Sequence, residues 1–484
     1  MTFNSPGVYI QDVKSGAQIV SQASSSIGVL LGATRSGKIG EAQLVSSFTE
    51  FINLYANGLD TPFMKDSVLP YAVHGFFTNG GQQLYIVRVA SKTAKCATAT
   101  FEELGVELVA SYEGTWGNDL KITIKKNEDW AEINKVFDVT VDLGGGDTSK
   151  ITEVTKDTFA SALLSNTKVS KWLKEINPIE NAEDNGKYTG ELEEKTIVFS
   201  NGADGVSDLV DSDYTDALTS LDVLDDVTLV AIPGQTSVVI NDALMAYCDN
   251  NNLFPILDMP IGSTVKQTKE YRKSISAKGG CLAYPWGKMN DPLTNTLKTV
   301  PSCGHVMGVY ARTIEERGVH KAPAGTEAVV RGFVEMETKL TNNDIAVLNP
   351  VGVVCIQSRP NAGIVIWGAR ALTSDTTMRY VSDVLLNYNI KRSLYNGTQF
   401  AVFEPNDESL WKRVEATCKA FLESLRKQGS LVGTPEEAYY VTVDKTNNTK
   451  DTIDAGFLNI EIGYAPSKPA EFVVIKLAHS IEQS

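Results

Sequence analysis

The chain has 484 residues, of which 42% are hydrophobic and 21% charged, and its length predicts roughly two to four domains with buried cores. Asp and Glu number 59 against 44 for Lys and Arg, which gives a formal net charge of −15. No segment concentrates basic residues among aromatic ones. This balance argues against a nucleic-acid groove and favours a protein that stays soluble at high copy number before it assembles.

The cysteines and the start of the chain indicate the cellular compartment in which the chain folds. The six cysteines stand singly, several of them in apolar runs such as Val351–Ile356, which predicts reduced, buried side chains. Residues 1–7 include neither a basic start nor an apolar stretch, and no run approaches the ~18 apolar residues of a membrane span. We therefore expect the chain to fold in a cytoplasm.

The first strand pattern stands apart from the rest of the chain. Val8 and Ile10 alternate with polar neighbours after a Pro-Gly turn, which is typical of a half-buried strand. Residues 14–26, rich in Ser, Gln, Ala and Gly, have the composition of a linker. We assign residues 1–20 to an N-terminal strand arm and its linker.

An α/β layer is predicted over residues 21–95. A buried strand begins at Ile27, and a second strand is expected at Gln83–Val89. Helices are expected at Ser47–Tyr55 and around Tyr71–Phe77. A helix that is followed by Gly-Gly and a strand suits the first part of an α/β domain.

The pattern changes between residues 96 and 202. Strands with period-two alternation are predicted at Leu120–Ile124 and Phe137–Val141, and one helix at Thr158–Ile176. The acidic, Gly- and Asn-rich stretch 178–194 fits exposed loops. We interpret residues 96–202 as a mostly β domain that is inserted into the α/β domain.

Strands and helices alternate again in residues 203–355. Three strands and two intervening helices are predicted, at Val227–Ile232, Val238–Asn250, Leu253–Asp258, Val265–Lys278 and Cys281–Tyr284. This alternation predicts a mainly parallel sheet that is covered on both faces. The fold class is therefore α/β, as part of an α+β multidomain chain.

Residues 356–463 are predicted to form a C-terminal α+β domain with an amphipathic helix. The helix spans Leu410–Lys427 and has one apolar stripe. Asn406 or Asp407 can cap its start, and Gly429 ends it.

A second lone strand lies within residues 464–484. A proline-bearing link, 464–470, precedes the apolar strand Glu471–His479. A lone strand cannot bury its faces or satisfy its backbone groups, so each arm needs a sheet edge to join. Two such arms predict that copies of the chain exchange strands.

One motif raises an alternative function, an ATPase that powers an assembly. Gly32–Lys38 follows a buried strand with the spacing of a P-loop. However, Ile39 stands where a hydroxyl binds magnesium, and Gly40 where a helix starts, so a plain strand-to-loop turn is the favoured interpretation. Asp258 at the end of an apolar strand is interpreted as a capping or turn residue and not as a magnesium ligand.

No residue pattern predicts catalysis, a cofactor or a bound metal. The four histidines include no pair at ligand spacing, and Cys303 with His305 supplies two ligands at most. His305 is interpreted as a structural histidine with satisfied hydrogen bonds. Because a Gly-x-Ser-x-Gly elbow is also absent, we interpret the chain as a structural protein and not an enzyme.

Nine stretches in order along the chain carry a resemblance to a known family. They are Pro6–Tyr9, Ser111–Asp119, Pro301–Thr313, Glu316–Gly325, Asn342–Pro350, Arg359–Gly363, Trp367–Arg370, Ser393–Asn396 and Phe403–Asn406. Together they resemble the tail sheath proteins of contractile phage tails and of R-type bacteriocins.

The resemblance implies a subunit that stacks as six-membered rings into a helical sleeve around an inner tail tube. Baseplate proteins lie at one end of such a sleeve and a tail terminator or collar at the other, and contraction drives the tube through a cell envelope. The resemblance also implies a central domain of subtilisin-like topology without catalysis, no cofactor, no nucleic-acid partner and no membrane insertion. The particle is then a virion tail or a bacteriocin, made in the bacterial host cytoplasm. A non-contractile, capsid-like shell protein stays open as the alternative.

Three sets of residues are predicted to contact other subunits. The strand arms contribute Val8, Tyr9, Ile10, Phe472, Val474, Ile475 and Leu477. The helix 410–427 is expected to face the inner tube, as the resemblance implies, through Lys412, Arg413, Lys419, Arg426 and Lys427. A set of candidate intersubunit charges consists of Arg312, Glu316, Arg317 and Lys321. For these charges and for the charged face of the helix, a solvated surface is the alternative interpretation.

Overall fold

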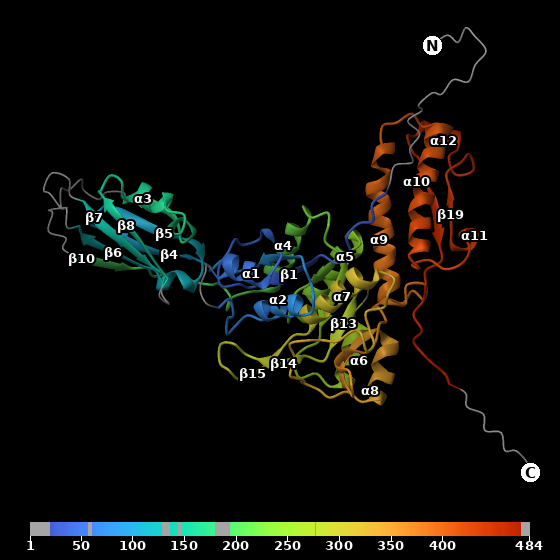
Figure 1. The fold of residues 1–484 in the computed structure, drawn as a ribbon, viewed down its shortest axis with the longest axis horizontal. Coiled ribbons are helices and arrows are strands. Elements are labelled where there is room, and N and C mark those ends of the chain that lie inside the picture. Colours follow the sequence, from blue (N-terminus) through green and yellow to red (C-terminus); the bar gives the residue numbers. More distant parts are fainter. Residues whose placement is uncertain are drawn as a thin grey trace, which may run out of the picture. The chain divides into compact units, whose positions relative to one another are not determined.

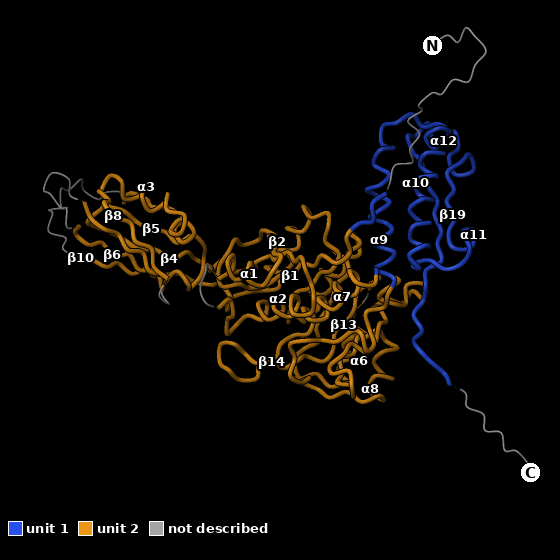
Figure 2. The backbone as a smooth tube through the Cα atoms, in the orientation of Figure 1, with its two compact units in different colours: residues 1–23, 318–320, 385–484 blue, residues 24–317, 321–384 orange. Residues whose placement is uncertain are grey.

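The computed structural model describes residues 20–56, 61–127, 136–143, 147–179, 194–275 and 277–475 (Figure 1). Contacts within the chain divide these residues into two compact units (Figure 2). The larger unit contains residues 24–317 and 321–384, and the smaller one residues 20–23, 318–320 and 385–475. Both units combine helices and strands, so the predicted mixed α/β fold class is confirmed.

The larger unit is built on an eight-stranded sheet. Its strands are β1 (Gly28–Gly32), β2 (Ala42–Val45), β3 (Leu84–Arg88), β11 (Leu229–Ala231), β12 (Phe254–Asp258), β13 (Cys281–Tyr284), β17 (Val353–Arg359) and β18 (Gly363–Ile366). The order is β18-β17-β13-β12-β11-β1-β3-β2, and only the two edge strands run antiparallel to their neighbours. The predicted mainly parallel sheet is confirmed, and every residue of β11, β12 and β13 is buried.

Seven of the described helices of this unit pack around that sheet. They are α1 (Phe48–Tyr55), α2 (Leu69–Thr78), α4 (Asp211–Ala217), α5 (Val238–Asn251), α6 (Val265–Ser274), α7 (Cys303–Arg317) and α8 (Asn342–Leu348). The helices predicted at Ser47–Tyr55, Tyr71–Phe77 and Val238–Asn250 are confirmed. The prediction for α6 extends too far, because the chain becomes extended at Ile275. A small antiparallel sheet, β15-β14-β16, adds the strands β14 (Gly287–Asn290), β15 (Leu297–Val300) and β16 (Glu335–Met336).

Two glycines allow α7 to approach α2 closely. Gly304 and Gly308 lie about one turn apart on α7. A Cβ atom at position 304 would lie 2.3 Å from the carbonyl oxygen of Ala72, and one at position 308 would lie 2.4 Å from that of Phe76. Both neighbours are backbone atoms of α2, so only glycine fits at these two crossing points.

Asp258, the last residue of β12, holds the N-terminus of α7. Its Oδ1 accepts a hydrogen bond from the Cys303 amide at 3.0 Å, and its Oδ2 accepts one from the Gly234 amide at 3.1 Å. Because the side chain is 1% exposed, burial raises the pKa of Asp258 to about 6, although these hydrogen bonds oppose the shift. The predicted capping role is confirmed.

Two antiparallel sheets occupy the chain between β3 and β11. The first, β10-β6-β7-β8, consists of β6 (Lys121–Lys126), β7 (Phe137–Asp142), β8 (Thr148–Val154) and β10 (Glu194–Val198). The second, β4-β5-β9, consists of β4 (Cys96–Phe101), β5 (Val106–Glu113) and β9 (Leu173–Pro178). The strands predicted near residues 120–124 and 137–141 are confirmed as β6 and β7.

The helix that was predicted at Thr158–Ile176 is wrong in its second half. The helix α3 covers only Phe159–Ser165, and a 3₁₀ turn follows at Val169–Lys171. The chain then forms β9, which pairs with β5. Pairing with a neighbouring strand thus outweighs the local helical pattern.

The smaller unit surrounds one long amphipathic helix. It contains residues 385–398 of α9 (Val381–Thr398), α10 (Glu408–Lys427), α11 (Pro435–Ala438), α12 (Lys450–Asp454), and the antiparallel pair β19 (Tyr439–Thr442) and β20 (Glu461–Tyr464). The amphipathic helix predicted at Leu410–Lys427 is confirmed as α10. Asp407 is its cap, since Oδ1 accepts from the amides of Ser409 and Leu410 at 2.9 Å.

The loop that follows β1 does not have the structure of a P-loop. The chain continues into β2 and not into a helix, so the predicted strand-to-loop turn is confirmed. The Gly37 carbonyl accepts a hydrogen bond of 2.6 Å from Nη1 of Arg88. Lys38 Nζ lies 2.9 Å from Glu41 Oε2 at the surface, where the two form an ion pair.

Replacing Arg88 by Met is expected to destabilise the larger unit by about 2 kcal/mol. Arg88 is fully buried, and its guanidinium also donates to the Glu113 carbonyl at 2.8 Å, so the substitution leaves two carbonyl groups without their donor. Urea unfolding measures the change. The control is Lys92→Met, which makes the same replacement at an exposed position nearby. Equal unfolding midpoints for the two variants would contradict a stabilising role for Arg88.

Candidate assembly surfaces

The C-terminal arm exposes an apolar run. The backbone stays paired as far as Ser467, whose amide donates to the Ser430 carbonyl at 3.0 Å. Residues 471–475 have neither helical nor strand structure in this single chain. The predicted arm residues Phe472, Val474 and Ile475 are 75%, 78% and 78% exposed. Such a row of exposed apolar side chains is typical of a segment that is covered by a partner.

The other predicted arm residues lie outside the described part of the chain. They are Val8, Tyr9, Ile10 and Leu477. Their predicted role stays a prediction.

The cations predicted to face an inner tube lie on the exposed side of α10, and most of them are already paired. Lys419 Nζ lies 2.6 Å from Glu415 Oε1, and Arg413 Nη2 lies 3.6 Å from Glu404 Oε2. Glu423 binds Arg426 at 2.7 Å and Lys427 at 3.8 Å, and the Arg426 hydrogen bond lowers the pKa of Glu423 to about 2. Lys412 is exposed beside them. This face therefore carries a mixture of charges and not a purely positive stripe.

The four predicted intersubunit charges do come together. Arg312, Glu316, Arg317 and Lys321 all line one hollow of about 220 Å³ at the end of α7. Arg317 and Lys321 share Glu327, at 2.7 Å and 3.7 Å. These ion pairs are exposed, so each contributes little to the stability of the folded subunit.

Arg312 differs from the other three because it is tied to the backbone. Its guanidinium donates to the carbonyls of Asn79 and Val329, both at 2.9 Å, and burial lowers its pKa. It therefore holds the C-terminal part of α7 against neighbouring loops.

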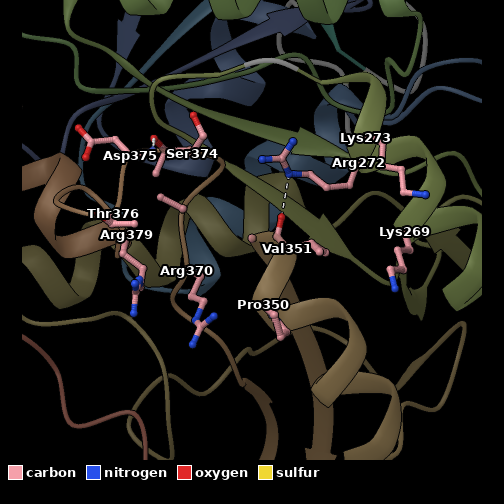
Figure 3. A pocket seen from close by; sticks show the side chains of 13 residues that line it. Lys269, Arg272, Lys273, Pro350, Val351, Arg370, Ser374, Asp375, Thr376 and Arg379 are labelled. Carbon is pink, nitrogen blue, oxygen red and sulfur yellow. Dashed lines mark hydrogen bonds between the residues drawn. The ribbon is translucent and has the colours of Figure 1, made fainter.

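One large surface hollow was not predicted from the sequence. It measures about 470 Å³ and is lined by five basic side chains and one carboxylate, those of Lys269, Arg272, Lys273, Arg370, Arg379 and Asp375 (Figure 3). The lysines come from α6, whereas Arg370 and Arg379 come from the loop after β18. Because about one hundred residues separate the two segments, only the Lys-rich sequence of α6 signals the site. We call this hollow the basic cleft.

His305 is buried, as predicted for a structural residue, but the expected satisfied hydrogen bonds are wrong. Neither ring nitrogen has a hydrogen-bond partner among the described residues. The ring stacks on Phe333 with centroids 3.8 Å apart, and Gly75 and Gly332 approach it closely. Burial lowers the pKa of His305 to about 3, so the imidazole is neutral.

The cysteines are unpaired, and most of them lie in the interior of the chain. All six cysteines are free; five are buried, as predicted, and Cys96 is half-buried. Within the described ranges, no three His, Cys, Asp or Glu side chains are arranged to hold a metal ion. Among the same residues, no helix combines the length and the apolar character that crossing a membrane requires.

Two family models and two known tail sheath proteins match the sequence of this chain. Residues 210–372 match the phage tail sheath protein central domain, and residues 373–478 match the phage tail sheath C-terminal domain. The tail sheath protein of Escherichia phage P2 is 21% identical over 304 residues, which cover 62% of this chain and 69% of that protein. The tail sheath protein of Salmonella phage ViI is 23% identical over 40% of this chain and 30% of its own length.

Solved structures share the fold along nearly the whole chain. The PVC sheath complex of an extracellular contractile injection system, in its contracted state, has a TM-score of 0.62 and 22% identity, and the match covers 100% of this chain and 99% of that one. The sheath tail protein of Desulfitobacterium hafniense has a TM-score of 0.64 and 14% identity, over 90% of this chain and 94% of that one. Two domain matches in sequence and these similar folds together show that the chain belongs to the phage tail sheath family.

Proposed function

We propose that this chain is the repeating sheath subunit of a contractile tail or injection system. In this proposal, copies stack as six-membered rings around an inner tail tube, between a baseplate and a terminator or collar, and contract to drive the tube through a cell envelope. The particle is a virion tail or a bacteriocin, assembled in the host cytoplasm. The subunit acts mechanically and not as an enzyme.

The observation that carries the proposal is the exposed apolar arm at residues 472–475. Pairing with a sheet edge in another chain would cover these side chains and satisfy the backbone groups of the arm. Joining an edge in a neighbouring copy would link bodies that can then move without breaking the connection. The N-terminal arm at residues 1–20 has the same role in this proposal.

We further propose a domain organisation in which the central and C-terminal domains assemble the sheath and a separate domain faces outward. Residues 21–95 and 203–355 form the central, subtilisin-like domain, residues 96–202 an outer domain, and residues 356–463 the C-terminal sheath domain. The proposed boundary between residues 355 and 356 lies within β17, and the compact units exchange between Val384 and Leu385. The C-terminal arm then begins at residue 464.

Deleting residues 469–484 is expected to leave a folded subunit that forms no sleeves. The deletion retains the Ser467–Ser430 hydrogen bond and removes the exposed apolar residues 472–475. Electron microscopy of negatively stained protein measures assembly, and circular dichroism checks the fold.

A matched pair of substitutions tests the same point without shortening the chain. Phe472→Ser with Val474→Ser should reduce sleeve formation, whereas Phe457→Ser, at a residue 62% exposed outside the arm, should not. Normal sleeves from the deletion variant would contradict the arm model. Spheres or rigid filaments from the full chain would favour a non-contractile shell protein.

A further inference from the structure

Most of the net negative charge of the chain lies in one stretch. Residues 196–265 contain eleven aspartates and no Lys, Arg, His or Glu, whereas the whole chain has a net charge of −15. Five of these aspartates are exposed on the segment around α4 and α5, namely Asp208, Asp216, Asp222, Asp225 and Asp242. None of the five forms an ion pair within the described part of the chain. We call this surface the acidic face.

Exposed aliphatic side chains lie within the acidic face. Val210, Val223, Val238 and Val239 are between 49% and 80% exposed. A surface of charged residues alone is typically solvated. A surface that combines aspartates with exposed valines has the composition of a contact surface.

The basic cleft has the charge opposite to that of the acidic face, and hydrogen bonds to the backbone hold one of its arginines in place. Arg272 Nε donates to the Val351 carbonyl at 2.8 Å and Nη1 to the Ile275 carbonyl at 2.7 Å, which joins α6 to the loop before β17 (Figure 3). Lys269 and Arg379 are exposed at the cleft. Ile261 and Val347, 58% and 42% exposed, belong to the segment before α6 and to α8, which packs on α6.

The two surfaces belong to one layer of helices. β11, β12 and β13 are adjacent and parallel, with α5 and α6 as the connections between them. Successive right-handed connections place both helices on the same face of the sheet. α4 packs on α5 at the acidic end, and α8 packs on α6 at the basic end. Among the described residues, no ion pair joins the five exposed aspartates of the acidic face to Lys269 or Arg379 of the basic cleft.

We propose that the basic cleft of one copy binds the acidic face of the next copy. This contact rests on the proposed function and names the surfaces through which neighbouring subunits dock, in addition to the arms. Different patches meet in the contact, so it runs head to tail and repeats into an open helix if it does not close. The partner is a second copy because this chain itself displays an acidic surface that the cleft complements.

Charge reversal tests the contact on the full chain. One variant carries Lys269→Glu and Arg379→Glu, and the other carries Asp216→Lys and Asp225→Lys; all four positions are exposed. Each variant alone is expected to associate roughly tenfold more weakly than the wild type, because like charges then face each other. An equimolar mixture should regain association, since both contacts between unlike variants are complementary. Sedimentation velocity measures association, and circular dichroism checks the fold.

The control is Lys92→Glu with Lys121→Glu, which lowers the net charge as much as Lys269→Glu with Arg379→Glu does, at exposed positions outside the cleft. The contact would be overturned if both charge-reversed variants associated as strongly as the wild type. It would also be overturned if their mixture did not regain association. Binding of inorganic phosphate to the wild type, without recovery in the mixture, would instead assign the cleft to small anions and also overturn it. Recovery in the mixture without sleeves from the wild type would retain the contact and contradict the proposed function.

Discussion

Replacing Gly304 by Ala is expected to destabilise the larger unit by more than about 3 kcal/mol or to prevent its folding. The new Cβ atom would lie 2.3, 2.6 and 2.7 Å from the carbonyl oxygen, Cα and carbonyl carbon of Ala72. These are backbone atoms, so relief requires α2 to move away from α7 and to disrupt the surrounding core. Urea unfolding followed by far-UV circular dichroism measures the loss.

The same helix provides both a second test and a control. Gly308→Ala should act in the same direction, because its Cβ would lie 2.4 Å from the Phe76 carbonyl oxygen. Glu316→Ala introduces the same residue on the exposed side of α7 and should shift the unfolding free energy by less than about 0.5 kcal/mol. A midpoint for Gly304→Ala equal to that of Glu316→Ala would contradict the close approach of the two helices.

The local sequence pattern predicted correctly those helices and strands that are also stabilised by contacts with distant parts of the chain. The strands β1, β3, β11, β12 and β13 of the sheet were predicted because continuous apolar runs such as Phe254–Asp258 are buried on both faces, whereas β2, β17 and β18 were not predicted. The wrong half of the helix at 158–176 has a physical reason, since Val169, Trp172, Leu173 and Ile176 have the spacing of a helical stripe. Three of these side chains are buried in the core of the two antiparallel sheets and Ile176 packs against it, so the same pattern serves a turn and a strand.

The assembly surfaces could be predicted only where they are continuous in sequence. The arm residues Phe472 and Val474 are recognisable because apolar residues follow a proline-bearing link. The basic cleft joins α6 to residues near Arg379, and no local pattern reports that distant segments meet. The crossing of α2 and α7 was missed for a related reason. A side chain at position 304 would collide with the backbone of α2, and α2 is distant from α7 in the sequence.

Replacing Asp258 by Asn is expected to change how stability depends on pH. Burial raises the pKa of Asp258 to about 6 in the folded chain, above its ordinary value of 3.8, so the folded state binds the proton more tightly. The resulting stabilisation is complete below the ordinary pKa and is lost as pH rises through about 6. The free energy of unfolding of the wild type, relative to Asp258→Asn, should therefore fall by about 2 kcal/mol between about pH 4.5 and 7.5.

The substitution Asp258→Ala tests the capping role of Asp258 separately from the titration of its carboxyl group. It removes the acceptor for the Cys303 and Gly234 amides at every pH, so about 3 kcal/mol should be lost throughout the range. Asp66→Asn, at an exposed loop position, controls for the removal of one carboxylate. Parallel pH profiles for the wild type and Asp258→Asn would contradict the effect of burial on this carboxyl group. Wild-type stability of Asp258→Ala would instead show that α7 does not depend on β12 for its cap, because the substitution leaves the helix sequence itself unchanged.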